Sequence, residues 1–218
     1  YLRYLIQNIF GNILVLFYIH LQLKFNIMGL DMYLYKRSYV KNWEHTIPEK
    51  RHKITIKLGK NVRKDIKPER ICSIVEEVAY WRKFNALHNW FVENCANGDD
   101  DCKEVYVDDN QLKELLETLK KVKNSLDKSD KKKVKVKTGW SSTEGDTYTE
   151  IDVFSDTSLA EELLPTQSGF FFGGIEYDEW YYENVTKTIK ILEDLLVENE
   201  TELPEGTWGG DFYYRASW

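Results

Sequence analysis

Trp81, Arg82, Asn85 and His88 bring several chemical abilities together in one short segment of the chain. A guanidinium group can grip an anion through two hydrogen bonds, and it or an indole ring can stack on a planar group. Amide and imidazole groups hydrogen-bond in either direction. A small-molecule site needs a few such polar groups converging in an aromatic wall. These four residues are therefore our first candidates for a ligand site.

Their spacing suggests a helix. Pro68 suits the first turn of a helix, and no Gly or Pro follows before Cys95, so we predict one long helix from about Pro68 to Cys95. At about 100° per residue, Asn85 and His88 interrupt an apolar stripe on that helix. A buried polar group without a partner costs about 1 to 3 kcal/mol. Either protein groups satisfy these two side chains or a ligand does, and both alternatives stay open.

A second candidate is the glycine-rich stretch 167–180. We predict a buried strand at 170–172 and a helix capped by Asp178, whose first N–H groups could face a ligand. The stretch matches neither the phosphate-binding loop nor the dinucleotide fingerprint, and Ser168 is not in a Gly-x-Ser-x-Gly elbow. A tight turn wedged by aromatic residues is the structural alternative. As candidate pocket residues we add Ser168, Gly169, Tyr177 and Asp178.

Metal and cofactor chemistry has no recognisable motif. His45 and His52 lack the HExxH spacing, and the three cysteines include no CxxC pair, so we expect no metal and no cofactor. Cys95 and Cys102 could bridge, but free thiols are expected in a reducing, cytoplasmic compartment.

Composition bounds the size of the core and the class of partner. The chain has 218 residues, 42% of them hydrophobic, which is enough for one core and one domain. Its formal net charge is -6, whereas bulk nucleic-acid binding needs a basic surface. We therefore expect a small molecule or another protein as partner, and no bulk nucleic acid.

Residues 1–27 differ in composition from the rest. They contain no acidic residue, and Asn12, His20 and Gln22 interrupt their apolar stretch, which falls short of the roughly 20 apolar residues of a membrane span. Three alternatives are open for this segment: a weak membrane anchor, an extra amphipathic helix, or translation from upstream of a start at Met28. We favour upstream translation, and we favour the membrane anchor less.

Further patterns predict the elements that position the candidate residues. Alternation and short apolar runs predict strands at 30–34, 54–58, 105–107, 170–172 and 212–218. Helices are predicted from a cap at Asp108 or Asp109 to about 122, at 159–164 and from Asp178 to about 198. A hairpin is expected on a mobile insert at about 127–150. We predict an α+β fold over residues 28–218: one domain, with a mixed or antiparallel sheet and three main helices packed mostly on one side.

Several sequence blocks also carry a resemblance. They are MGLDMYL at 28–34, residues 66–70, YWRK at 80–83, residues 163–166, SGFFFG at 168–173, EYDE at 176–179 and the closing residues 213–218. Together they resemble an uncharacterised family of bacteriophage and prophage proteins. The resemblance implies that Met28 is the natural start and that the protein acts in the cytoplasm of an infected or lysogenic bacterium. It implies no activity, so it assigns no role to Asn85 or His88.

Our leading expectation is a phage-encoded binding protein for a small ligand or a host factor, with a nucleotide-like metabolite or signal as the small ligand. An enzyme that acts on a nucleotide or phosphate substrate, with His88 as general base, is an alternative, although we favour binding over catalysis. An inhibitor of a host protein is another. Its anchor residues would be Trp43, Trp140 and Trp208.

Overall fold

Strand β1 (Asp31–Tyr39) is central in a four-stranded antiparallel sheet with the order β4-β1-β8-β5. The computed structural model describes residues 29–218 except 41–42, 144 and 202–208, so the predictions for residues 1–27 and for Met28 and Trp208 lie outside the described residues. In β1, the buried Met32 and Leu34 alternate with tyrosines on the opposite face. The predicted alternation of this strand is confirmed.

The long helix predicted from Pro68 to Cys95 is wrong. A short 3-10 turn, η2 (Pro68–Arg70), leads into strand β4 (Ser73–Arg82), which pairs with β1, and only α2 (Asn85–Cys95) is helical. The β4 segment is rich in β-branched and aromatic residues, which favour strands. Its buried Ala79 and Trp81 alternate with exposed Tyr80 and Arg82, as the period of two requires. The helical stripe that would join Trp81 to His88 therefore does not exist.

The other two long helices are confirmed. Helix α3 (Asp109–Leu126) begins at Asp108, whose side chain and that of Gln111 form a reciprocal capping box. Helix α5 (Glu179–Thr201) follows Asp178, whose Oδ1 accepts a hydrogen bond from the Tyr181 N–H at 3.0 Å. The short α4 (Ser158–Leu163) ends before Pro165, as predicted.

Two further strands of the sheet, β8 (Asp211–Ser217) and β5 (Val105–Val107), are also confirmed. The strand predicted at 54–58 is mostly wrong, because only β2 (Lys57–Leu58) pairs, with β3 (Asn61–Val62). The strand predicted at 170–172 is wrong. There the Phe172 N–H donates to Gly169 O at 3.2 Å, which closes a turn, and the segment is not a strand of any sheet in the described chain.

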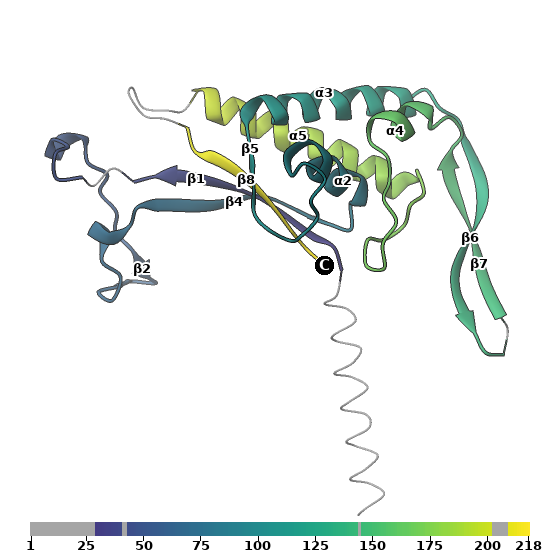
Figure 1. Ribbon diagram of the computed structural model, residues 1–218, viewed down its shortest axis with the longest axis horizontal. Coiled ribbons are helices and arrows are strands. Elements are labelled where there is room, and N and C mark those ends of the chain that lie inside the picture. Colours follow the sequence, from purple (N-terminus) through teal and green to yellow (C-terminus); the bar gives the residue numbers. More distant parts are fainter. Residues whose placement is uncertain (1–28, 41–42, 144, 202–208) are drawn as a thin grey trace, which may run out of the picture.

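Strands β6 (Lys131–Ser141) and β7 (Gly145–Phe154) form a separate antiparallel hairpin that projects from the body (Figure 1). The predicted hairpin is confirmed, and it spans residues 131–154 where about 127–150 was expected. Its base is joined to the body where the Phe154 N–H donates to Tyr177 O at 3.0 Å. The 3-10 turn η1 (Pro48–Lys50) lies in the loop after β1.

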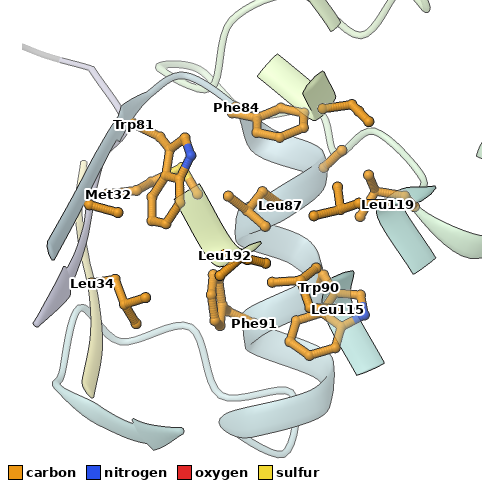
Figure 2. Close-up of a cluster of buried hydrophobic side chains, with 14 of the residues drawn as sticks. Met32, Leu34, Trp81, Phe84, Leu87, Trp90, Phe91, Leu115, Leu119 and Leu192 are labelled. Carbon is orange, nitrogen blue, oxygen red and sulfur yellow. The ribbon is translucent and has the colours of Figure 1, made fainter. Parts of the chain in front are cut away.

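The core lies between the sheet and the helices. Met32, Leu34 and Trp81 point from the strands towards α2, and Leu115 and Leu192 close the cluster from α3 and α5 (Figure 2). The helices cover one face of the sheet only (Figure 1), so the predicted α+β fold with an antiparallel sheet is confirmed. Among the described residues, no helix combines the length and the apolar character of a membrane span.

Candidate ligand-binding site

The turn from β4 into α2 is built around Lys83, whose φ of 59° lies in the left-handed region. That conformation costs a residue with a side chain about 1 to 2 kcal/mol, so the surrounding contacts must impose it. The Lys83 N–H donates to Leu30 O at 2.7 Å, which ties the turn to the start of β1. The turn therefore fixes where the Lys83 side chain begins.

The Lys83 side chain runs between two glycines. A β-carbon added to Gly29 would lie 3.0 Å from Lys83 Cε, and one added to Gly173 would lie 3.1 Å from Lys83 Cβ and 3.3 Å from Lys83 O. Gly173 also has a φ of 90°, which only glycine adopts readily. A side chain at either glycine would crowd the lysine, so both glycines leave room for it. Among the described residues, its ammonium group makes no hydrogen bond or ion pair.

Asn85, the first residue of α2, fastens the loop at residues 165–178 beside this turn. Its Nδ2 donates to Phe172 O at 3.0 Å and to Gly174 O at 2.7 Å, and its Oδ1 accepts from the Gln167 N–H at 3.0 Å. The loop is also fixed to β1, because the Leu30 N–H donates to Phe171 O at 3.2 Å. The loop is thus pre-organised by protein contacts.

A surface pocket of about 390 Å³ opens where the turn, the loop and the start of α5 meet. This volume is within the range of small-molecule sites, about 300 to 1,000 Å³. We call it the Lys83 pocket. Its lining consists of Arg82, Lys83, Gly173, Gly174, Glu176, Asp178 and Trp180.

The pocket combines cations, carboxylates and an aromatic wall. Trp180 is 41% exposed and rests edge-on against the buried Phe84, with ring centroids 6.2 Å apart. Arg82 Nη1 lies 3.2 Å from Asp31 Oδ1, which also accepts a hydrogen bond from Tyr80. This ion pair orients the guanidinium group without burying it. The arrangement can bind an anion and stack a planar ring.

His88 lies in a different place and is satisfied by the protein. Its Nδ1 is 2.8 Å from the Tyr214 hydroxyl, its Nε2 is 3.1 Å from Asp100 Oδ2, and its side chain is 1% exposed. Burial, and secondarily the Asp100 charge, raises the pKa of Tyr214 well above its ordinary value, so the phenol stays protonated and donates. The cavity beside the imidazole measures about 10 Å³, room for one water molecule and not for a substrate.

No protein-family model, curated protein or solved structure matches the chain. No residue role is therefore transferred from a relative. The functional interpretation rests on the side-chain geometry of the described residues.

The structure brings two of the eight predicted site residues, Arg82 and Asp178, to the Lys83 pocket. Trp81 is in the core, where its Nε1 donates to Thr188 Oγ1 at 2.9 Å, and Asn85 and His88 have the protein partners described above. The other three do not line the pocket: Ser168 and Gly169 are exposed on the loop, and Tyr177 packs on Tyr181 with ring centroids 4.9 Å apart.

Five lining residues were not among the named candidates, although four of them lie in the candidate stretch 167–180. They are Lys83, Gly173, Gly174, Glu176 and Trp180. The Gly173-Gly174 pair was the one local signal of a close backbone approach. The left-handed conformation of Lys83 has no such signal. Gly and Asn are the residues that usually adopt this conformation, and position 83 is a lysine.

Proposed function

We propose that this protein binds a small anionic ligand that carries a planar ring system, of the nucleotide kind, in the Lys83 pocket. The observation that carries the proposal is the Lys83 ammonium group. Lys83 has a strained backbone conformation, its ammonium group has no hydrogen-bond or ion-pair partner among the described residues, and the residue lines the same pocket as the exposed Trp180. Strained residues concentrate at binding and catalytic sites, because elsewhere selection relieves the strain.

Each part of such a ligand has a matching group. Lys83 and Arg82 can bind a phosphate or carboxylate group, since both carry positive charge at the same rim. The Trp180 indole offers a face for a planar ring. Glu176 can accept hydrogen bonds from ring N–H or amino groups, which purines and pyrimidines carry and which a plain phosphate lacks. The mixed lining therefore favours a nucleotide-like molecule over inorganic phosphate.

Binding is a better match to this pocket than catalysis. The lining among the described residues has no histidine, cysteine or serine, so the Ser–His and Cys–His nucleophile pairs are absent from it. His88, the base of the enzyme alternative, lies beside the separate 10 Å³ cavity.

Thermal-shift and calorimetric titrations with mononucleotides, cyclic nucleotides and cyclic dinucleotides test the proposal. We expect at least one ligand to raise the Tm, and we expect Lys83→Ala or Trp180→Ala to weaken its binding by tenfold or more, about 1.4 kcal/mol. Lys187→Ala is the matched control, because Lys187 is an exposed lysine of α5 that does not line the pocket. Absence of binding by the whole panel at about 1 mM, or equal binding by Lys83→Ala, would refute the proposal.

A second candidate, binding to a host protein, is favoured by one feature of the hairpin. Trp140, near the end of β6, is 68% exposed, and exposed tryptophans are frequent anchors of protein interfaces. Trp43 is also exposed, in the loop after β1. Capture of one defined host protein by the wild-type chain, lost in Trp140→Ala and kept in Trp43→Ala, would support the hairpin as the anchor. Capture that is unchanged by Trp140→Ala would exclude it.

A further inference from the structure

The face of the sheet turned away from the helices is dominated by tyrosine. Six of the chain's 14 tyrosines alternate with buried residues on strands β1, β4, β5 and β8 and therefore point to this side. They are Tyr33, Tyr35, Tyr39, Tyr80, Tyr106 and Tyr213, and we call this surface the tyrosine face. No helix of the described chain packs on it (Figure 1).

The side chains of the tyrosine face are already ordered. Tyr33 and Tyr35 lie side by side with ring centroids 5.9 Å apart and an interplanar angle of 6°, and Tyr33 also contacts Tyr80 at 5.3 Å. The Arg37 guanidinium lies 4.2 Å from the centre of the Tyr213 ring and pairs with Glu104 at 2.7 Å. Ordered side chains lose little entropy on binding, which is the property of an interface anchor.

The composition of this face indicates a protein partner. Tyrosine and arginine are enriched in protein interfaces and lysine is depleted. Within the four described strands, the three arginines of β1, β4 and β8 point to this side, and the one lysine, Lys36, points to the other. Carboxylates such as Asp31, Glu77 and Asp211 share the surface, so it lacks the positive potential that single-stranded nucleic acid requires.

The charges of Arg215 and Glu77 indicate which protein could be the partner. On β8, Arg215 is directly opposite Tyr33 of β1, and on β4, Glu77 is directly opposite Tyr35. The two opposite charges therefore lie diagonally across β1. They are separated by two strand spacings of about 4.8 Å each across the sheet and by two residues of about 3.4 Å each along it. Within one molecule these two side chains do not form an ion pair with each other. Neither side chain has a hydrogen bond or ion pair with the described residues.

We propose that the tyrosine face packs against the same face of a second copy of this chain. In a two-fold interface, a contact of residue i with residue j is matched by the contact of j with i. A two-fold axis that lies in the plane of the interface, passes between Tyr33 and Tyr35 and is perpendicular to the Arg215–Glu77 diagonal brings each Arg215 over Glu77 of the other copy. Two ion pairs then flank a centre of stacked tyrosines. Elsewhere, the net charge of -6 makes two copies repel each other, so this nearly balanced face is the surface where they can meet.

Sedimentation equilibrium over a range of concentrations, with the wild type and charge-reversal variants, tests the proposal. We expect a wild-type dimer, at least tenfold weaker association for Arg215→Glu and for Glu77→Arg, and recovery of association in the double reversal. Tyr35→Ala should also weaken the dimer. Lys135→Glu is the control, because Lys135 is an exposed residue of the hairpin, remote from the sheet face.

Three results would overturn the proposal. They are a monomeric wild type at about 1 mM, a dimer that neither single reversal weakens, and a double reversal that stays as weak as the single ones. Circular dichroism of each variant separates lost association from lost folding. Arg215 and Glu77 are exposed, so their reversal is expected to leave the fold intact. A single-stranded oligonucleotide that binds a monomeric wild type and not Tyr35→Ala would assign the face to nucleic acid instead.

Discussion

Nδ2 of Asn85 lies 2.7 Å from the carbonyl oxygen of Gly174, so the first residue of α2 directly holds the loop that lines the Lys83 pocket. A buried asparagine at this position is therefore part of the scaffold of the site and does not touch the ligand in the proposed binding mode. The segment 82–85 thus serves the site in two ways. Arg82 and Lys83 line it, and Asn85 fixes the loop residue Gly174 that also lines it.

Asn85→Ala is expected to lower the free energy of unfolding by about 1 to 3 kcal/mol, since it leaves buried backbone groups of the loop without partners. It should also weaken ligand binding, because the loop is released. Urea denaturation and calorimetry measure the two effects. Asn89→Ala, on the next turn of the same helix, is the matched control. Stability equal to that of the control would show that the three hydrogen bonds of Asn85 are unimportant.

His88→Ala is expected to cost about 1 to 3 kcal/mol of stability, because the Tyr214 hydroxyl loses its buried acceptor and a cavity forms. Affinity for the ligand should stay within a factor of about two, well below the tenfold that marks 1.4 kcal/mol. The enzyme alternative predicts the opposite pattern. Turnover of a nucleotide that His88→Ala abolishes, with stability and binding retained, would contradict our assignment of His88 to the core.

Lys83→Gly is expected to raise the free energy of unfolding by about 1 kcal/mol, because glycine adopts a φ of 59° without steric cost. The same change should abolish ligand binding. Lys83→Ala separates the two effects, since it keeps the strained conformation and removes the ammonium group. We expect it to lose binding without any gain in stability. A Lys83→Gly variant that is less stable than the wild type would show that the backbone strain has been overestimated.

The contrast between α3 and β4 shows how far the sequence alone reaches. Helix α3 could be predicted because Asp108, Gln111 and the leucine periodicity are all local signals that agree. In β4, the pairing with β1 decides the conformation, and spacing that also fits a helix misled the prediction. Tertiary pairing overrides local pattern there.

The pocket could be predicted only in part for a related reason. Arg82 and Asp178 were identified by their chemical type and helix-capping position. Lys83 and Trp180 meet because the loop after α4 folds back onto the β4–α2 turn, through hydrogen bonds to Asn85 that join residues far apart in sequence. No local spacing contains that information.

Cys95 is expected to react with an alkylating reagent more slowly than Cys72. Burial, and secondarily the charges of Asp108 and Glu114, raises its pKa to about 12, whereas Cys72 is exposed. Because the thiolate is the nucleophile, little Cys95 reacts near pH 8 while the fold is intact, and its labelling should accelerate as the pH approaches 12 or on unfolding. Mass spectrometry after brief iodoacetamide treatment measures both sites. Equal labelling of Cys72 and Cys95 in the native protein at pH 8 would contradict the burial of Cys95.

The most direct test of the central claim is a nuclear magnetic resonance titration that observes the indole N–H of each tryptophan and the backbone amides. With a nucleotide from the binding panel, we predict saturable shifts of the Trp180 indole and the amides of Lys83 and Gly174, while the indole of Trp140 stays unchanged. Saturable shifts confined to other residues, or none in the Lys83 pocket for any nucleotide, would contradict the account.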